Sequence, residues 1–500
     1  MLKHETDGKP VRFVRVATKR HREGSGRIHP NPVLIVFSFS LVLACVPLAW
    51  CQREGTGVLP EHRGHSASPV GRKGIRFCPL RFSKPKIVDL KGGIARMAVA
   101  DLGNGHPDIV LTDYTGGPGT NGVDIFYGKG GGRIGRMHYY PLHGGPDALA
   151  VADLGNGHPD IVVTRSNRRA VTILYGVGGG RIGPIRSYGV GNYPGNLAVA
   201  DLGNGHPDIV VVNDHTVSVL YGMGGGRIGP IRSYPVGRQP YGLAVADLGN
   251  GHPDIVVAND HTVSVLYGAG GGRIGPIRSY PAGRHLFWLA VADLGNGHPD
   301  IVVDSGRKVV VFYGVGGGRF GPVRSYWVGK RQTDLLVSDL GNGHPDIVIT
   351  SHHKVFVFYG VGGGRFAPPV SYSSSGGRWI SSIEVADLGN GHPGIVVSLS
   401  DPKTKEGRVE VLYGIGDGRF APPVLYPAGG EAEGEGLYPM AVADLGNGHP
   451  DIIGVHRFAG TMVVLYGEGK EPGCGAPSMS MMRKGPVPAG SMGHEKAGRR

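Results

Sequence analysis

One eight-residue loop, DLGNGHPD, contains side chains that could bind a metal ion. The chain contains eight copies of this loop, one of them with a single substitution. The copies begin at Asp101, Asp153, Asp201, Asp247, Asp293, Asp339, Asp387 and Asp444, and the seventh alone departs, with Gly394 in place of the last Asp. Each complete copy offers two carboxylates and one amide, and calcium in proteins is bound by six to eight such oxygens. The predicted calcium ligands in the seven complete loops are Asp101, Asn104, Asp108, Asp153, Asn156, Asp160, Asp201, Asn204, Asp208, Asp247, Asn250, Asp254, Asp293, Asn296, Asp300, Asp339, Asn342, Asp346, Asp444, Asn447 and Asp451.

The same loop also has a purely structural interpretation that needs no metal. In the fourth copy, Asp247 would cap backbone N–H groups, Gly249 and Gly251 would take positive φ, and Pro253 would stiffen the entry into the next strand. Two carboxylates per loop predict weak calcium binding, weaker still in the seventh copy. Zinc is disfavoured because the loop histidines, such as His252, are spread one per repeat unit, and we expect them to face solvent.

The spacing of the copies indicates which elements position these loops. Successive copies lie 52, 48, 46, 46, 46, 48 and 57 residues apart, and repeats of this length form solenoids or propellers whose units bury apolar faces by stacking. The 90 Gly and 38 Pro among 500 residues disfavour long helices, because both residues break helix interiors. Between the glycines, segments such as TVSVLY (216–221) alternate with a period of two, which predicts strands.

One repeat unit divides into four strands. The unit that begins at Leu243 contains LAVAD (243–247), DIVVAN (254–259), TVSVLYG (262–268) and IRSYPAG (277–283). The first strand has the small side chains that a crowded centre needs, and the fourth carries an arginine that would protect an outer edge. Four antiparallel strands repeated radially make a propeller blade, so the predicted class is all-β.

The number of strands in the first and last units predicts a closed ring. The last unit has strands at 440–443, 451–455 and 461–466 but no fourth strand, and residues 84–90 before the first unit supply the matching pattern. We predict an eight-bladed β-propeller closed by this N-terminal outer strand on the last blade, because seven blades with a spare unit would leave an unpaired sheet. The closure places Cys78 and Cys474 on the two sides of one connection, which predicts a disulfide in an exported protein.

These motifs resemble those of a known repeat family. ADLGNGHPDIVV (246–257) and VFYGVGGGRFAPPVSY (357–372) are similar to FG-GAP (VCBS) repeats, the units of the integrin-α type β-propeller, and the resemblance extends over roughly residues 82–467. It implies calcium binding in the loop between the first two strands, where the family usually has D-x-[DN]-x-[DN]-G-x-x-D. The loop here is one residue shorter and lacks the inner acidic positions, so the expected cofactor is weakly bound calcium and no other.

Charge and hydropathy bound the cellular context. Of the net charge of +13, residues 1–32 carry +5 and residues 467–500 carry +3, and no cluster of aromatic and basic residues accompanies the remainder, so nucleic acid is excluded as a partner. The only long apolar run, residues 33–50, follows a basic stretch, as in a secretory signal with a long n-region; an internal start upstream of Ile28 and an uncleaved anchor stay open. Either alternative predicts a secreted, periplasmic or cell-surface protein.

The predicted organisation therefore has four parts. They are residues 1–51, the basic region with the signal or anchor; 52–77, a disordered linker; 78–474, the propeller; and 475–500, a disordered tail. We expect a monomer that touches a membrane only through an N-terminal anchor.

Comparison of the copies assigns function to one face. The connections from first to second and from third to fourth strand hardly vary, whereas the two other connections differ in every blade, and binding residues are commonly carried on variable loops. The predicted ligand-binding residues are Tyr193, His215, Tyr241, His261, Arg284, His285, Phe287, Trp288, Arg331, Arg378 and Trp379. Such aromatic, basic and imidazole side chains suit a carbohydrate or an extracellular protein, although some of these aromatics would instead fill gaps between blades.

Catalysis is the second hypothesis. The sequence contains no Gly-x-Ser-x-Gly elbow, no HExxH and no dinucleotide fingerprint, and its glycine runs recur once per blade as connections. Tyr241, Arg284 and His285 could nevertheless abstract a proton from an acidic polysaccharide, so a lyase or hydrolase is the alternative to an exported binding or adhesion module.

Overall fold

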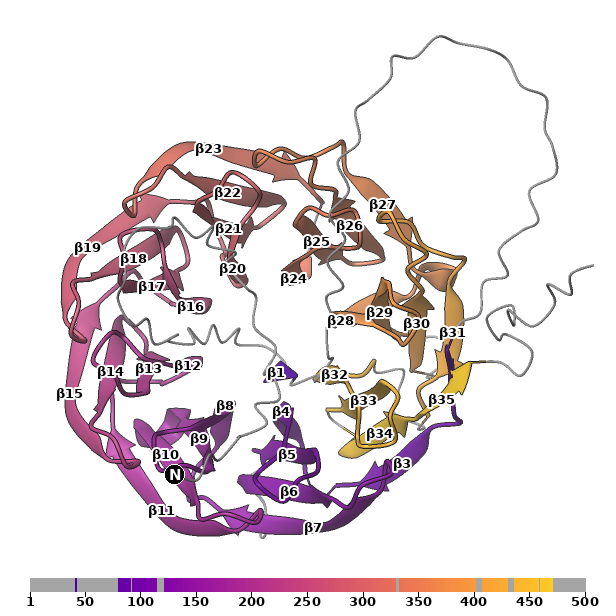
Figure 1. Ribbon diagram of the computed structural model, residues 1–500, viewed down its shortest axis with the longest axis horizontal. Helices are drawn as coiled ribbons and strands as arrows, with labels where there is room; N and C mark the ends of the chain where they lie inside the picture. Colours follow the sequence, from indigo (N-terminus) through magenta and orange to yellow (C-terminus); the bar gives the residue numbers. More distant parts are fainter. Residues whose placement is uncertain are drawn as a thin grey trace, which may run out of the picture.

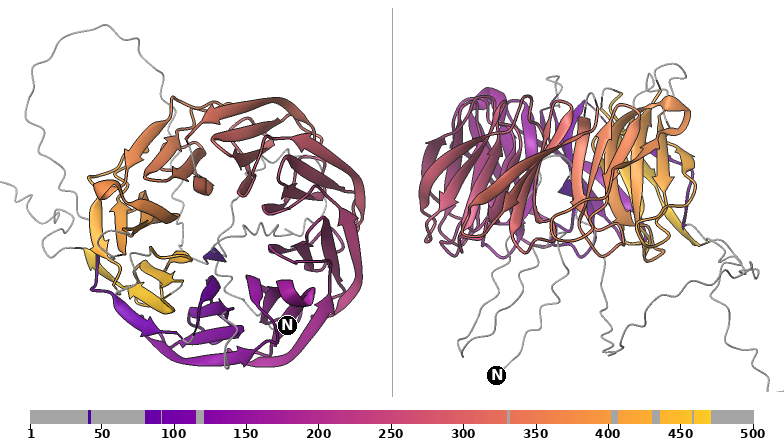
Figure 2. Two further views of the ribbon diagram at one scale, coloured as in Figure 1. Left: turned by 180° about the vertical axis from the view of Figure 1, so that it is seen from behind. Right: turned by 90° about the horizontal axis from the view of Figure 1, so that it is seen from above.

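The chain folds into a closed ring of eight four-stranded antiparallel blades (Figure 1). The computed structural model describes residues 41–42, 80–90, 92–114, 121–329, 332–401, 407–429, 436–457 and 459–470. Figure 2 shows the ring from behind and from its edge, with connecting loops on two opposite rims. The predicted all-β class and the eight blades are confirmed.

Blades 1 to 4 follow one another along the chain, and the strands of each run in order from the inner to the outer strand. Blade 1 contains β4 (Ile94–Ala100), β5 (Asp108–Asp113), β6 (Gly122–Gly128) and β7 (Ile134–Pro141); blade 2 contains β8 (Pro146–Asp153), β9 (Pro159–Arg165), β10 (Ala170–Gly176) and β11 (Ile182–Gly189); blade 3 contains β12 (Leu197–Ala200), β13 (Asp208–Val212), β14 (Thr216–Gly222) and β15 (Ile228–Pro235); and blade 4 contains β16 (Leu243–Asp247), β17 (Pro253–Ala258), β18 (Thr262–Gly268) and β19 (Ile274–Pro281).

Blades 5 to 8 complete the ring. Blade 5 contains β20 (Leu289–Asp293), β21 (Pro299–Ser305), β22 (Lys308–Gly314) and β23 (Phe320–Trp327); blade 6 contains β24 (Gln332–Ser338), β25 (Asp346–Ser351), β26 (Lys354–Phe358) and β27 (Val370–Ser373); blade 7 contains β28 (Trp379–Asp387), β29 (Pro393–Ser400), β30 (Arg408–Leu412) and β31 (Val424–Pro427); and blade 8 contains β32 (Met440–Ala443), β33 (Asp451–His456), β34 (Thr461–Leu465) and β3 (Lys86–Asp89). Two 3-10 turns, η1 (Ser166–Arg168) and η2 (Ser375–Gly377), lie in connections.

The strands of blade 4 lie close to where the sequence pattern puts them, and two of them have different bounds. Strands β16 and β18 have the predicted bounds, and β17 begins one residue early at Pro253. Strand β19 begins at Ile274, three residues before the expected start, because a bulge between Leu266 and Gly268 brings Ile274 opposite Gly268. Periodicity could not reveal this added length, since Gly and Pro interrupt the pattern there.

The apolar core lies between neighbouring blades and not within one blade. Eight clusters of buried residues occupy the eight interfaces, and the cluster between blades 8 and 1 combines Ile94 and Met97 with Val455 and Met462. Each inner strand contacts the next, including β32 with β4. A fully buried Val, Ile or Met contributes about 1.5–3 kcal/mol, so each blade is stabilised mainly by its two neighbours.

The two ends of the repeat array meet at one seam. Strand β3 pairs antiparallel with β34 as the predicted closing strand, and a second pair joins β2 (Leu80–Phe82) to β35 (Gly467–Lys470). Leu80 and Phe82 are buried in the cluster between blades 7 and 8. The Tyr413 hydroxyl donates to the Leu80 carbonyl at 2.5 Å, as Tyr267 donates to Gly318 at 2.7 Å between blades 4 and 5. The seam thus reproduces a contact of the regular blades.

The N-terminal predictions fall almost wholly outside the described residues. Of the predicted signal or anchor segment, Leu41–Val42 alone is described, as β1, which runs parallel to β4 near the centre of the ring (Figure 1). Cys78 and Cys474 also lie outside the described residues, so the signal, the anchor and the disulfide stay predictions. In the part of the chain that is described, no helix has the length and apolarity needed to cross a membrane.

Candidate functional site

The two rims of the ring differ in what holds them. On one rim, which we call the repeat rim, the DLGNGHPD loop of most blades lies beside the glycine-rich connection of the next, such as GGGR (316–319). The Gly317 N–H donates to the Gly249 carbonyl at 3.0 Å, and the Gly131 N–H donates to the Gly446 carbonyl at 2.8 Å, which links blade 8 to blade 1. The opposite rim, the variable rim, carries the connections that differ between blades. The nearly constant loops therefore join blades.

The first half of the DLGNGHPD loop is a capped turn. In blade 4, Asp247 Oδ1 accepts the N–H groups of Gly249 at 2.8 Å and Gly251 at 3.0 Å, and Asn250 Oδ1 accepts the His252 N–H at 3.0 Å. Both glycines have positive φ, 92° and 86°, which side chains disfavour. The predicted capping and glycine conformations are confirmed, and the His252 residue is exposed.

The last aspartate of the loop is buried and fully engaged. Asp254 Oδ2 accepts the Leu248 N–H at 2.9 Å, while Oδ1 accepts the Asn250 amide at 2.7 Å and the Gly268 N–H at 2.7 Å. Burial raises the pKa of Asp254 to about 6, although these hydrogen bonds lower it. The corresponding buried residues with a raised pKa are Asp108, Asp160, Asp208, Asp300, Asp346 and Asp451.

These contacts do not fit the calcium site that the family resemblance implies. The Asn250 amide nitrogen, and not its oxygen, faces Asp254, and both oxygens of Asp254 already accept N–H donors. Asp247 Oδ1 accepts two further N–H groups. A hard cation needs oxygens that point at it, whereas here N–H donors occupy those directions. Calcium binding in these loops stays a prediction, and the hydrogen bonds argue against it.

On the variable rim, blades 4 and 5 bring an exposed aromatic pair next to a carboxylate. The rings of Tyr241 and Phe287 are 5.0 Å apart, and their residues are 42% and 40% exposed. Asp260 Oδ2 lies 3.2 Å from His261 Nε2, and Asp260 Oδ1 lies 3.3 Å from His285 Nδ1. The backbone joins these groups, because the His285 N–H donates to the Asp260 carbonyl at 2.7 Å. The ring pair and the Asp260 group lie on three neighbouring connections of the same rim, and we call these five residues together the Tyr241 patch.

A buried carboxylate fixes the aromatic connection of blade 5. Asp304 Oδ1 accepts the N–H groups of Phe287 and Trp288, both at 2.8 Å. Burial raises the pKa of Asp304 to about 7, although those two N–H groups lower it. Trp288 is half-buried and packs against the cluster between blades 5 and 6, whereas Phe287 is exposed. Of the two adjacent aromatics, Phe287 is thus the one that faces solvent.

A second group of predicted residues meets across blades 6 and 7. The Trp379 ring lies 6.3 Å from the His352 ring and 6.5 Å from the His353 ring, and Trp379 is 46% exposed. Arg378 Nε lies 3.1 Å from Asp401 Oδ2, and the Arg378 carbonyl lies 3.1 Å from His353 Nδ1. Arg378 is therefore held in a network, and Trp379 is the accessible member.

The other predicted ligand-binding residues are dispersed. Tyr193 is 72% exposed on blade 3, where His215 Nε2 lies 3.3 Å from Asp214 Oδ2. Arg284 is exposed, and its N–H donates to the Ser305 hydroxyl at 3.2 Å. Arg331 lies outside the described residues.

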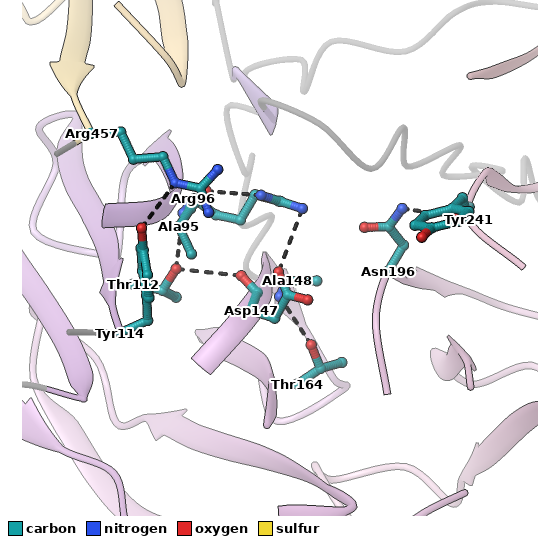
Figure 3. Close-up of polar contacts among 10 residues, drawn as sticks. All are labelled: Ala95, Arg96, Thr112, Tyr114, Asp147, Ala148, Thr164, Asn196, Tyr241 and Arg457. Carbon is teal, nitrogen blue, oxygen red and sulfur yellow. Dashed lines mark hydrogen bonds and ion pairs between the residues drawn. The ribbon is translucent and has the colours of Figure 1, made fainter. Parts of the chain in front are cut away.

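Charged residues at the inner ends of blades 8, 1 and 2 were not among the predicted site residues (Figure 3). Arg96 Nη2 lies 3.5 Å from Asp147 Oδ1, which joins blades 1 and 2. Arg457 Nε donates to the Tyr114 hydroxyl at 3.2 Å, and the guanidinium lies 5.1 Å from the Tyr114 ring centre. Internal comparison could have found them, since the inner strand reads LAVA in blades 3 to 5 but contains Arg96 in β4 and Asp147 in β8.

Two buried groups of this inner region, Asp334 and Tyr438, have a raised pKa. Burial raises the pKa of Asp334 to about 8, although the N–H groups of Ile383 and Leu335 lower it. Burial also raises the pKa of Tyr438 to about 12, and Arg96 opposes this shift while Asp334 adds to it. The centre of the variable rim therefore contains buried ionisable groups, whereas those of the Tyr241 patch are more exposed.

Comparison with known proteins found a match to a family of repeats. The FG-GAP-like repeat model matches residues 248–303 and 340–397, and no curated protein matches the chain. Among solved structures, a Dos1 propeller shares 12% identity over 76% of this chain and 95% of its own, with a TM-score of 0.51. A lectin of Agrocybe aegerita that recognises non-reducing terminal N-acetylglucosamine shares 22% over 67% and 94%, with a TM-score of 0.44.

A third solved structure, BBS1N in complex with ARL6DN, shares 13% identity over 63% of this chain and 90% of its own, with a TM-score of 0.42. At these identities the likeness extends to the fold alone. The matched repeats, the eight internal copies and the ring of eight blades agree with one another. The chain is therefore an eight-bladed β-propeller that contains FG-GAP-like repeats.

Proposed function

We propose that this propeller is an exported binding module that recognises a carbohydrate, or else a protein partner, through its variable rim. The Tyr241 patch carries the proposal. Two exposed aromatic rings 5.0 Å apart can stack on the C–H face of a sugar, while Asp260 and the imidazoles of His261 and His285 can hydrogen-bond its hydroxyls. A monosaccharide unit seated on the rings would thus meet both kinds of group.

Export is part of the proposal and is supported by the sequence alone. The basic N-terminal stretch and the apolar run at 33–50 have the order of a secretory signal. Fractionation of cells that express the full chain, combined with N-terminal sequencing of the exported protein, tests this part. Recovery of the uncleaved chain in the cytoplasm alone would contradict it.

The binding proposal is tested by a glycan array probed with the full chain, followed by affinity measurements on any glycan bound. Tyr241→Ala and Phe287→Ala should each weaken binding about ten-fold or more, because aromatic anchors carry most of the energy of such contacts. Trp327→Ala is the matched control, since Trp327 is 60% exposed on the outer strand β23. Equal losses in all three variants would contradict the assignment of the site.

A protein partner is the alternative outcome of the same experiment. If no glycan binds, a library of displayed surface proteins is screened for binding to the full chain. The Phe287→Ala variant of the chain is the negative control. Binding that this variant retains would place the interface elsewhere on the propeller.

The catalytic hypothesis is favoured by one observation, the 3.3 Å approach of His285 Nδ1 to Asp260 Oδ1. A carboxylate at this distance can orient an imidazole for proton abstraction, with Arg284 neutralising the uronate next to the acidic C–H. Lyase activity would appear as a rise in ultraviolet absorbance when an acidic polysaccharide is incubated with the chain. The His285→Ala variant should abolish it, and binding without product formation would leave the binding module as the function.

A further inference from the structure

The outer strands of four consecutive blades present arginine at one repeated place. Arg186, Arg232, Arg278 and Arg324 occupy the same register in β11, β15, β19 and β23, and all four are exposed. We call these residues the outer arginine band. Figure 1 shows that the four strands follow one another along the circumference of the ring. The band therefore lies on the outer wall, away from the Tyr241 patch.

The positive charge of this wall is not balanced by acidic neighbours in the sequence. The four outer strands β11, β15, β19 and β23 contain one Arg each and no Lys, Asp or Glu. Within the described part of the chain, no carboxylate forms an ion pair with a band arginine. One charge of either sign per strand is enough to discourage edge pairing. Protection of the edge therefore does not explain why four consecutive outer strands carry a charge of the same sign.

Two of the four guanidinium groups of the band lie over tyrosine rings. Arg278 lies 6.0 Å from the centre of the Tyr267 ring, and Arg324 lies 5.8 Å from the centre of the Tyr313 ring. The tyrosine rings are themselves fixed, because the Tyr267 hydroxyl lies 2.9 Å from that of Tyr280. An arginine stacked on a fixed ring loses less conformational freedom when it binds an anion, so the band is partly pre-organised.

The chemistry of the wall between the arginines favours a polysaccharide over a nucleic acid. The residue before each band arginine is an exposed aliphatic side chain, Ile185, Ile231, Ile277 or Val323. Aliphatic groups can cover the C–H faces of sugar rings while the arginines meet sulfates or carboxylates. Single-stranded nucleic acid needs open aromatic faces for its bases, whereas the tyrosines of this wall are half-buried and paired through their hydroxyls.

We propose that the outer arginine band binds a linear anionic polysaccharide along the circumference of the propeller. The anionic groups are sulfates or carboxylates, spaced along a chain long enough to contact several blades. This surface is separate from the variable rim, so the protein would hold a polyanionic matrix on its wall and recognise a second ligand on its rim. The two surfaces are tested by different variants.

The test measures binding of the full chain to heparin, as a sulfated probe, and to polygalacturonate, as a carboxylated probe, at several salt concentrations. The fourfold variant Arg186→Ser, Arg232→Ser, Arg278→Ser and Arg324→Ser should weaken binding to the preferred probe about ten-fold or more and flatten its salt dependence. The fourfold Arg→Lys variant should retain most of the binding, because the charges stay in place. If the Ser variant does not fold, the twofold Arg232→Ser and Arg278→Ser variant is used in the same way.

The matched control removes four positive charges elsewhere on the surface. It combines Lys84→Ser, Lys354→Ser, Arg365→Ser and Arg419→Ser, all at exposed residues of blades 6, 7 and 8. It should bind both probes as the wild type does. An equal loss in the control would mean that net charge alone is recognised, and binding of single-stranded DNA in preference to both glycans would overturn the proposal. Tyr241→Ala should leave heparin binding unchanged, which separates this result from the proposed function.

Discussion

The last aspartate of each loop is the residue that joins the strands of its blade. Asp254 accepts hydrogen bonds from the end of β16, from the loop and from the Gly268 N–H at the end of β18. In blade 7, Gly394 stands in its place, and the Asn390 amide donates instead to the Gly414 carbonyl at 2.7 Å. Blade 7 thus shows a loop in which a hydrogen bond from the asparagine amide to a backbone carbonyl takes the place of the contact with the carboxylate.

Removal of this carboxylate should destabilise the blade strongly. Asp254→Ala leaves two buried N–H groups and one amide without an acceptor, which should lower the free energy of unfolding by about 2–4 kcal/mol. Chemical denaturation with fluorescence detection measures the loss. His252→Ala is the control in the same loop, and because its side chain is exposed its effect should stay within about 0.5 kcal/mol. Similar losses in both variants would contradict the assigned role.

The buried loop aspartates predict an unusual dependence of stability on pH. Burial raises the pKa of Asp254, Asp300 and Asp451 to about 6, above the value in an unfolded chain. Their contribution is fully present below the unfolded-state pKa and is lost as the pH rises through about 6. These three groups should therefore stabilise the fold more at about pH 4.5 than at about pH 7.5. Melting temperatures measured at both pH values contain this contribution.

The Asp254→Asn variant isolates this effect, because its side chain cannot titrate. The difference in melting temperature between the two pH values should shift toward greater relative stability at neutral pH in this variant. An unchanged difference would show that Asp254 has an ordinary pKa.

Residue-level prediction from the sequence succeeded where the cause is local. The positive φ of Gly249 and Gly251 and the cap by Asp247 depend on contacts within eight residues, so the loop pattern contains them. The orientation of Phe287 and Trp288 could not be predicted, because Asp304 fixes it from the end of a different strand. Neighbouring aromatics look alike in a sequence until the buried partner is known.

At the scale of elements, repetition made strand positions predictable, and departures from repetition mark the charged residues near the centre of the ring. The inner strands β12, β16 and β20 share the sequence LAVA, whose small apolar side chains predict a buried inner strand. Strands β4 and β8 depart from that pattern, each with a register shift near its start, and these strands carry Arg96 and Asp147. Variation between connections could not predict these two charges, because they lie within strands.

The closing strands should be indispensable to the fold. Removal of residues 1–90 deletes β2 and β3, exposes the edge of β34 and removes Leu80 and Phe82 from the core between blades 7 and 8. These two side chains alone contribute about 2 kcal/mol each. Thermal unfolding should occur at a clearly lower temperature, and size-exclusion chromatography should show association through the free edge.

The control for this truncation begins at Cys78 and keeps both strands. It should unfold at nearly the same temperature as the full chain and elute as one species, because it keeps β2 and β3 and loses only the two-residue pairing of β1 with β4. Equal stability of the two truncated proteins would show that the ring closes without β3.

At the scale of the whole molecule, the ring separates three kinds of surface. The repeat rim is occupied by hydrogen bonds between blades, the variable rim carries the Tyr241 patch and the inner charges, and the outer wall carries the arginine band. The array length and the closing strand made the ring predictable from the sequence. The arginines of the outer strands were predicted from the sequence as protection of the edge, and no binding role was assigned to them because the net charge between the termini averages these strands with the acidic loops of the repeat rim.

The stability of the entire ring should not depend on calcium. The loops that hold calcium in related repeats are here filled by N–H donors, with the Asn250 amide and the Leu248 and Gly268 N–H groups directed at Asp254. A cation that entered would have to displace these donors without gaining the six or more oxygens it requires. Differential scanning calorimetry with a calcium chelator, and then with excess calcium, should therefore give the same melting temperature. A rise of several degrees with calcium, reversed by the chelator, would show that the loops rearrange to bind it, since a ligand stabilises only the state to which it binds.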